Sequence, residues 1–213
     1  MSFLGLKTFD DPNRAPSSGS FATYMIVAPT SFFLGMLFSS FPYDYPLLWT
    51  SSPLPANFLS DLETHLQFLH ASPPLIPRIL HFLIAIGFAG FLLKLFKPSE
   101  ANLLFDGASL VLYVVGVIVY ITNIIKGLRV VTRGEWDADV QLREGEEVIG
   151  REDSLKVLAA SNTILALVLV GVLVLQAGQW YAERREREER AQFEAMERRE
   201  GKEGKGKGQK KKQ

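Results

Sequence analysis

The sequence contains no cysteine, and this absence removes several kinds of chemistry at once. Disulfide bonds, thiolate metal sites and a cysteine nucleophile are excluded. The sequence also lacks the motifs GxSxG, HExxH, Walker A and the dinucleotide-binding fingerprint. Its three histidines have no nucleophile or carboxylate at a recognisable spacing. We therefore expect a protein that is not an enzyme, with no catalytic residues, no cofactor and no metal site.

Charge is almost missing from four long stretches, although the chain as a whole carries 23 basic and 23 acidic residues. A helix needs about 20 mostly apolar residues to cross the hydrocarbon of a bilayer. A helix of a soluble protein would show polar residues along one face, whereas 111–121 and 164–175 are apolar on every side. We predict an all-α, polytopic membrane protein with four transmembrane helices, at about residues 21–41, 75–96, 103–125 and 155–180.

The first twenty residues lack the basic start, short apolar run and cleavage site of a signal peptide, so we expect the first apolar stretch to remain as an anchor. Lysine and arginine are retained on the cytosolic side of membrane proteins. With the N-terminus in the cytosol, sixteen basic residues fall on that side and seven on the other. This count predicts a cytosolic arm at 1–20, a cytosolic tail at 182–213, and loops at 42–74 and 126–154 on the opposite side.

The loop at 42–74 contains six prolines, which predict a stiff and mostly extended chain. Ser60 and Glu63 are placed as a capping box at the start of a short helix. His65 and His70 are five residues apart, which does not make them neighbours on a helix, so we expect solvated imidazoles and not metal ligands. The amphipathic helix is predicted from apolar residues at helical spacing: Phe58, Leu62, Leu66 and Leu69.

The loop at 126–154 is rich in acidic residues but lacks the ligand spacing of an EF-hand, so we expect no calcium site. The tail has glutamate–arginine pairs four residues apart, Glu186 and Arg190 among them, which predict an exposed helix that continues the fourth span. After Glu200 the composition of glycine and lysine predicts disorder.

The tail also bears on partners and on localisation. Its arginines alternate with glutamates and lack an aromatic stacking platform, so we expect no nucleic-acid partner, whereas its lysines can contact the lipid bilayer. Lys210 and Lys211, the fourth and third residues from the end, match the dilysine signal for retrieval to the endoplasmic reticulum. The alternative is a lysine-rich tail that matches this signal by chance.

The predicted spans carry no ionisable residue in their middle, where ion-coupled transporters usually have one. We expect Lys94 and Asp106, near span ends, to reach the membrane surface. Small and amide side chains within the spans either pack the four helices together or grip helices of another protein. The residues of this kind are Thr30, Ser31, Gly35, Ala85, Gly87, Ala89, Ser109, Gly116, Asn123, Ser161, Asn162, Gly171 and Gln176.

Residues 32–49 read FFLGMLFSSFPYDYPLLW, with a Pro-Tyr-Asp-Tyr sequence after a glycine-containing apolar stretch. This motif resembles a fungal family of endoplasmic-reticulum membrane chaperones, the secretory components that package amino acid permeases. Further similarities are Phe105-Asp106-Gly107, the stretch from Tyr120 to Asn123, and Leu173 to Gln176, so the resemblance extends over about 21–181.

The resemblance implies a non-enzymatic chaperone of the endoplasmic-reticulum membrane, whose partners are amino acid permeases and, through the tail, vesicle coat components. It makes the motif and the polar residues of the spans candidates for client binding: Gly35, Pro42, Tyr43, Asp44, Tyr45, Asp106, Asn123 and Asn162. Tyr43 to Tyr45 also have a simpler interpretation, as interfacial aromatic anchors and a turn-forming aspartate. A small tetraspan transporter or channel subunit, and a structural scaffold without a client, remain the alternatives.

Overall fold

In the computed structural model, residues 18–96, 100–134 and 150–210 are described, and most of them lie in helices. Four long apolar segments are able to cross a membrane by length and composition. These are α1 (Ser18–Trp49), α3 (Leu75–Leu95), α4 (Glu100–Val119) with its continuations η1 (Tyr120–Ile125) and α5 (Lys126–Arg133), and α6 (Arg151–Lys210). The prediction of an all-α protein with four transmembrane helices is confirmed. The predicted arm before residue 18 and the acidic stretch 135–149 lie outside the described residues.

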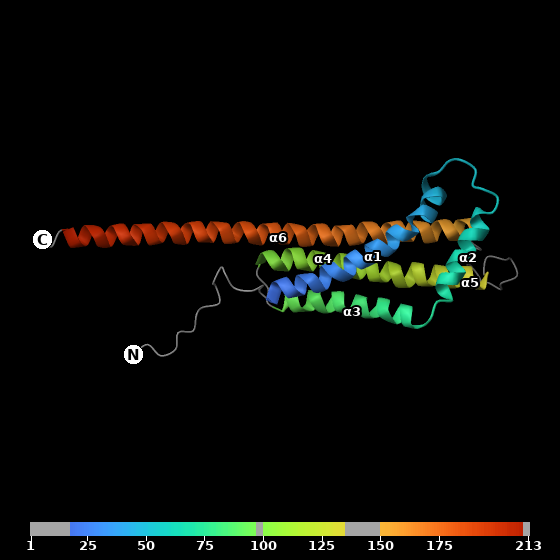
Figure 1. Cartoon of the computed structure of the whole chain (residues 1–213), viewed down its shortest axis with the longest axis horizontal. Helices are drawn as coiled ribbons and strands as arrows, with labels where there is room; N and C mark the ends of the chain where they lie inside the picture. The colour runs from blue at the N-terminus through green and yellow to red at the C-terminus, as the bar shows by residue number, and fades with distance from the viewer. Residues whose placement is uncertain (1–17, 97–99, 135–149, 211–213) are drawn as a thin grey trace, which may run out of the picture.

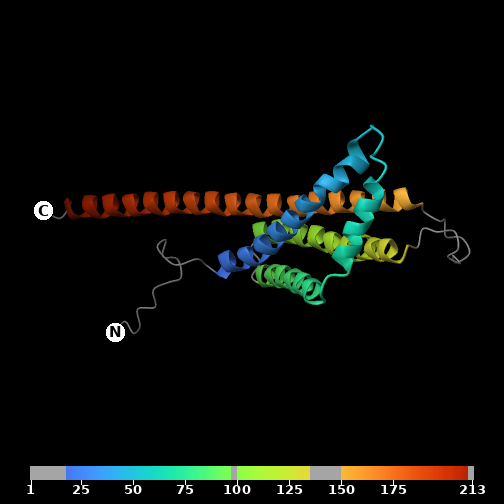
Figure 2. The same ribbon diagram turned by 45° about the vertical axis from the view of Figure 1, so that its right-hand side comes forward.

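The four long helices form a bundle in which α3, α4 and α6 run side by side and α1 crosses them diagonally (Figures 1 and 2). The predicted short helix is present as α2 (Phe58–His70), and it lies across one end of the bundle against α5. At the other end, α6 continues far beyond the other helices. We call these the α2 end and the tail end of the bundle.

Helix α1 runs through three prolines, Pro29, Pro42 and Pro46, and ends only at Trp49. Each proline removes one backbone hydrogen bond, but neighbouring helices and side chains make such losses tolerable in membrane helices. The prediction of an extended chain from Pro42 onward is therefore wrong for 42–49, which is helical. Consequently the Pro-Tyr-Asp-Tyr motif presents its side chains around a helix and not along a loop.

Close packing of the bundle depends on glycines that face other helices. A Cβ at Gly87 of α3 would lie 2.3 Å from Tyr113 Oη, and a Cβ at Gly90 would lie 3.0 Å from the carbonyl oxygen of Ala22 in α1. The Tyr113 hydroxyl in turn donates to the Ile84 carbonyl oxygen at 3.1 Å. Small residues allow such approach between membrane helices. One buried cluster fills the space beside these contacts: Ile26, Phe91, Tyr113 and Val172.

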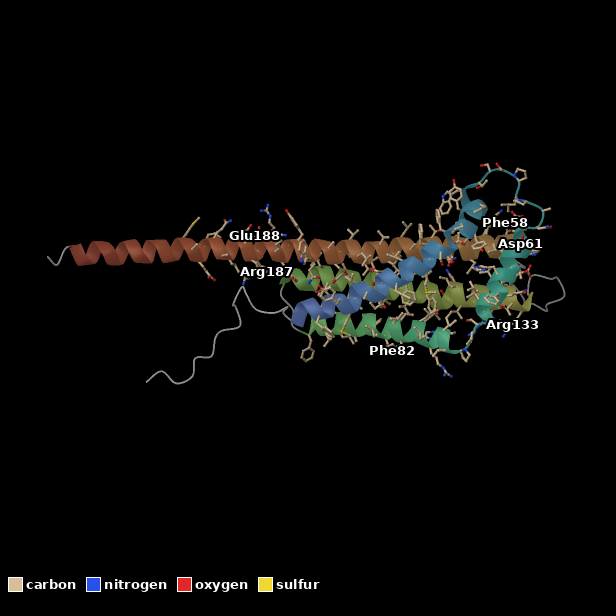
Figure 3. The ribbon with its side chains drawn as sticks, viewed as in Figure 1. Phe58, Asp61, Phe82, Arg133, Arg187 and Glu188 are labelled. Carbon is tan, nitrogen blue, oxygen red and sulfur yellow. The ribbon has the colours of Figure 1, made fainter. Side chains whose placement is uncertain are left out.

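The outward faces of the long helices are apolar. Phe38 of α1 is 77% exposed, Phe82 of α3 is 66% exposed and points away from the bundle (Figure 3), and Leu167 of α6 is 67% exposed. Water would penalise so much exposed apolar surface, whereas lipid chains solvate it without cost. This distribution agrees with helices that are surrounded by lipid.

The third span is longer than its sequence limits suggested, because η1 and α5 carry it to Arg133. Helix α5 is amphipathic: Val131 is buried, while Lys126 and Arg129 are exposed. The chain at 126–133, which was expected to be loop, is thus a helix whose apolar side packs against α2 and α6.

Helix α6 contains the fourth span and much of the tail. The predicted pair of Glu186 and Arg190 is present at 2.5 Å, and a second pair joins Arg184 to Glu188 at 3.0 Å. The backbone stays helical to Lys210, so the prediction of disorder after Glu200 is wrong for the residues described. Lys211 of the dilysine signal lies outside them.

Candidate functional site

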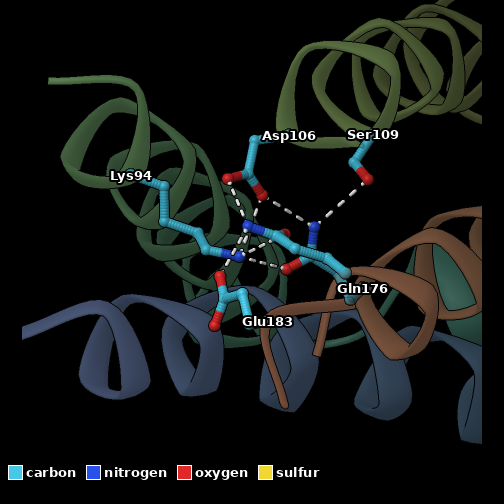
Figure 4. Close-up of polar contacts among 6 residues, drawn as sticks. Lys94, Asp106, Ser109, Gln176 and Glu183 are labelled. Atoms are coloured by element: carbon cyan, nitrogen blue, oxygen red, sulfur yellow. Dashed lines mark hydrogen bonds and ion pairs between the residues drawn. The ribbon is translucent and has the colours of Figure 1, made fainter. Parts of the chain in front are cut away.

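An ion pair between Lys94 of α3 and Asp106 of α4 lies inside the tail end of the bundle (Figure 4). The Lys94 Nζ is 2.9 Å from the Asp106 Oδ1, and the two side chains are only 7% and 1% exposed. The expectation that both reach the membrane surface is therefore wrong. Removing a charge from water is costly, and the opposite charge beside it offsets part of that cost.

Amide and hydroxyl groups of α6 and α4 satisfy the rest of this ion pair, which we call the Lys94 cluster. Lys94 donates to Gln176 Oε1 at 2.8 Å and to Gln179 Oε1 at 2.7 Å. The amide nitrogens of the two glutamines donate to the two oxygens of Asp106, at 3.1 and 2.8 Å. Gln176 also reaches Ser109, and Gln179 reaches Glu183. Three helices are thereby joined through one network.

The network has a physical consequence for the fold. A buried polar network stabilises a unique arrangement only when all its members are bonded, and here each carboxylate oxygen and the ammonium has a partner. Gln176 was among the residues predicted from the sequence to lie between helices, and Gln179 was not. The signal was available, because residues three apart on a helix share a face.

At the α2 end, the motif points a carboxylate inward. Asp44 of α1 is 7% exposed and accepts a hydrogen bond from Asn162 Nδ2 of α6 at 3.1 Å. Both residues were candidates from the sequence, 118 positions apart in the chain. Neither the spacing nor the composition indicated that they would meet.

The two tyrosines of the motif lie in different surroundings. Tyr43 stacks on His65 of α2 with ring centroids 4.6 Å apart, and His65 remains partly exposed. Tyr45 is half exposed and stacks on Trp49 at 5.9 Å. Phe41 joins this outward aromatic group. Tyr43 therefore packs against the bundle, whereas Tyr45 belongs to an outward group of aromatic rings of the kind that anchor helices at membrane interfaces.

Helix α2 is fastened by polar contacts at both ends. Arg151 of α6 donates to Glu63 at 2.5 Å and to Ser60 at 3.2 Å. Ser60 and Glu63 therefore do not form the predicted capping box, and the N-cap residue Asn57 makes no side-chain cap. His70 contacts the Thr132 hydroxyl of α5 at 2.8 Å.

Apolar packing completes the attachment of α2, through a cluster of Leu47, Leu62, Val131, Leu155 and Ala159. Between α1, α2 and α6 remains a cavity of about 20 Å³, lined by Asp44, His65 and Asn162 among others. Binding pockets for small molecules usually measure hundreds of Å³. Among the described residues, no group of three histidine or acidic side chains is placed to hold a metal ion.

The other candidates are scattered. Asp106 belongs to the Lys94 cluster at the opposite end from Asp44. Gly35 faces open space, where an added Cβ would meet nothing within 4 Å, and Asn123 is exposed on η1. The eight candidates therefore do not form one site. The structure gathers Tyr43, Asp44 and Asn162 beneath α2.

Comparison with known proteins identifies the family of this chain. Residues 17–213 match the model of the SHR3 chaperone family, described as ER membrane protein SH3. The chain belongs to this family. It is thus a chaperone of the endoplasmic-reticulum membrane and not an enzyme, as the resemblance implied. A chaperone family implies client proteins.

A curated relative of this family member is the secretory component protein psh3 of Schizosaccharomyces pombe. The two are 27% identical over 157 residues, which make up 74% of this chain and 67% of psh3. No solved structure matches the chain.

Proposed function

We propose that this protein assists the folding of amino acid permeases in the endoplasmic-reticulum membrane and their packaging into vesicles that leave it. The observation that carries the proposal is the match of almost the whole chain to a family of chaperones in that membrane. The printed name of psh3, a secretory component, agrees with a role in secretory traffic. Amino acid permeases are the proposed clients because the motif at 32–49 resembles that of permease chaperones.

Client recognition takes place within the bilayer in this proposal. A permease that is not yet folded exposes small and polar residues to lipid, where an unsatisfied backbone or amide group costs free energy. The outward faces of α1 and α3 are apolar and free of charge over most of their length, so another helix can lie against them. Vesicle coat components contact the cytosolic tail.

The motif holds the conformation that binds clients. Asp44 ties α1 to α6 through Asn162, and Tyr43 ties α1 to α2 through His65. Loss of both contacts loosens α1 at the α2 end, where apolar packing of Leu47 remains, while the Lys94 cluster still joins α3, α4 and α6 at the tail end. The motif thus acts by positioning helices and not by touching a reacting group.

Both termini lie in the cytosol in our proposal, with the α2 end in the lumen. The excess of basic residues in the tail supports this orientation. Lys210 and Lys211 then stand on the side where a retrieval signal is read. An N-glycosylation site introduced into the connection between α1 and α2 should be glycosylated, and one introduced at the C-terminus should remain unmodified.

The deciding experiment replaces Tyr43, Asp44 and Tyr45 together by alanine in cells whose own copy of the gene is deleted. The variant should stay in the membrane while amino acid permeases accumulate in the endoplasmic reticulum. Phe68→Ala on the exposed side of α2, outside the proposed client surface, is the matched control, and it should support delivery. Normal permease delivery by the triple variant would contradict the proposed role of the motif.

Transport is the second candidate function, because paired charges inside a membrane often mark an ion pathway. The Lys94–Asp106 pair is the observation that favours it. Flux of ions or amino acids through vesicles that contain the purified protein decides between the two functions. Transport is favoured if the vesicles show flux and Asp106→Asn abolishes it. A scaffold without clients instead predicts unchanged amino acid uptake after deletion of the gene.

A further inference from the structure

The third span contains a π-helical turn, η1, which carries two polar residues on the outside of the bundle. Thr122 and Asn123 are both exposed. The helix surface beside them is apolar and exposed: Val115 is 40%, Ile118 53% and Ile121 54% accessible. Single π-turns within helices occur frequently at functional sites. The turn therefore places a polar group on a surface that otherwise suits lipid.

The depth of Asn123 follows from the helix rise. Asn123 lies seventeen residues beyond Asp106 of the Lys94 cluster, or about 26 Å at about 1.5 Å per residue. The exposed Lys126 follows one turn later. If the Lys94 cluster marks the tail-end boundary of the hydrocarbon, which is about 30 Å thick, the Asn123 amide lies just inside the opposite boundary, near the α2 end. His81 of α3 lies at the same level, because its ring contacts that of Tyr120 at 6.2 Å.

The hydrogen bonds of this turn leave the amide largely unused. The Thr122 hydroxyl donates to the Ile118 carbonyl oxygen at 2.8 Å and lies 3.1 Å from Asn123 Oδ1. Both acceptors share one hydroxyl proton, and the Asn123 Nδ2 donates to none of the described residues. No described residue outside the turn hydrogen-bonds the Asn123 side chain. A carboxamide in hydrocarbon without partners is costly, and a bound partner removes that cost.

We propose that the Asn123 carboxamide is a docking point for a transmembrane helix that carries an uncharged polar side chain. This inference rests on the proposed function, because it assigns one contact between the chaperone and its client. A carboxamide both donates and accepts, which matches asparagine, glutamine, serine or threonine of a second helix. The apolar residues Val115, Ile118 and Ile121 then contact the apolar side chains that surround this group in the client.

The contact is weak enough for a chaperone, which must release its client. Hydrogen bonds between membrane helices change association by only about 3- to 30-fold. The Asn123 amide therefore binds a client helix while that helix still exposes a polar group. Once this group is buried in the folded client, the chaperone releases the helix. Selectivity for unfinished proteins follows from this difference.

Capture of a model helix in vesicles tests the proposal with the full chain. The probe is a 22-residue leucine-rich helix with one asparagine near one end, at the depth of Asn123, and one cysteine, reconstituted with the protein in phosphatidylcholine vesicles. Because the chain has no cysteine, Ile118→Cys supplies one reactive position beside the turn, and disulfide cross-linking measures capture. An all-leucine probe is the reference for non-specific contact.

Asn123→Leu should lower capture of the asparagine probe about 3- to 30-fold, to the level of the all-leucine probe. Thr64→Leu changes an exposed polar residue on α2, outside the four spans, and should leave capture unchanged. Thermal unfolding in detergent should be the same for both variants, since neither side chain is buried. Equal capture of the two probes, or undiminished capture by Asn123→Leu, would overturn the proposal.

Delivery of permeases in cells separates this inference from the proposed function. Reduced delivery with Asn123→Leu, together with lost capture, supports both. If capture does not depend on Asn123 while deletion of the gene still retains permeases, the docking point is wrong and the proposed function stands. If capture depends on Asn123 but deletion leaves delivery normal, the docking point stands and the permease function is wrong.

Discussion

Lys94 and Asp106 form an ion pair of 2.9 Å inside the bundle, and Gln176 and Gln179 of a third helix bind both of its members. The pair thereby joins α3, α4 and α6 at the end from which the tail extends.

Replacing Asp106 by alanine leaves the buried Lys94 without its anion. We expect a loss of about 3–5 kcal/mol in the free energy of unfolding, measured by thermal unfolding in detergent micelles. Lys94→Met combined with Asp106→Leu removes both charges and should cost less than Asp106→Ala alone. Arg78→Met, at an exposed position of α3, is the control and should change little. Equal stability of Asp106→Ala and the parent protein would show that the pair is not buried as described.

Gly87→Ala should destabilise the contact between α3 and α4, because the new Cβ would lie 2.3 Å from Tyr113 Oη and 2.8 Å from Tyr113 Cζ. Overpacking of this kind costs about 1–3 kcal/mol. Gly35→Ala is the matched control, since nothing lies within 4 Å of its added Cβ. Tyr113→Phe should partly rescue Gly87→Ala by removing the nearest atom. Thermal unfolding of the parent, Gly87→Ala, Gly35→Ala and the Gly87→Ala, Tyr113→Phe double variant checks this. Equal effects of the two glycine substitutions would argue against close packing at Gly87.

Glu63→Gln should loosen α2 by weakening its contact with Arg151, which is 2.5 Å long and partly exposed. Because solvent screens a pair of this kind, we expect faster amide hydrogen exchange in α2 and only a small loss of overall stability. Asp61→Asn on the exposed side of the same helix is the control (Figure 3). Unchanged exchange in Glu63→Gln would mean that apolar packing alone holds α2.

An exchange of Asp44 and Asn162 tests their contact. Asn162→Asp alone places two carboxylates face to face and should cost about 1–3 kcal/mol, because a buried acceptor loses its donor. Asp44→Asn combined with Asn162→Asp restores one amide and one carboxylate, so stability and permease delivery should both recover. Failure of the double exchange to recover stability would indicate that the two side chains do not meet in the folded protein.

Replacing Lys210 and Lys211 by serine tests the retrieval signal without changing the bundle. If coat proteins read this signal in the cytosol, the variant should escape to later compartments while its thermal unfolding stays the same. Lys205→Ser together with Lys207→Ser removes the same number of positive charges from the tail, and this variant should remain in the endoplasmic reticulum. Escape of both variants to the same extent would point to total charge and not to position.

The sequence alone determined the class of the protein and most of its helices. A helix satisfies its own backbone hydrogen-bonding groups in lipid. Four apolar stretches of sufficient length therefore predicted the all-helical fold class. The short helix at Phe58–His70 followed from its periodicity. The motif at 32–49 indicated the family because it is a pattern of neighbouring residues.

Contacts between distant residues were decided only by the tertiary structure. Lys94 and Asp106 looked like surface charges near span ends, because sequence position does not show which side of a helix faces its neighbours. Pro42 was expected to start a loop, because proline removes a backbone hydrogen bond and its ring crowds the preceding turn, whereas membrane helices tolerate proline where their neighbours satisfy the freed groups. Helix packing turned Asp44 inward to Asn162 and left Asn123 facing outward, although both are polar residues near the ends of apolar spans.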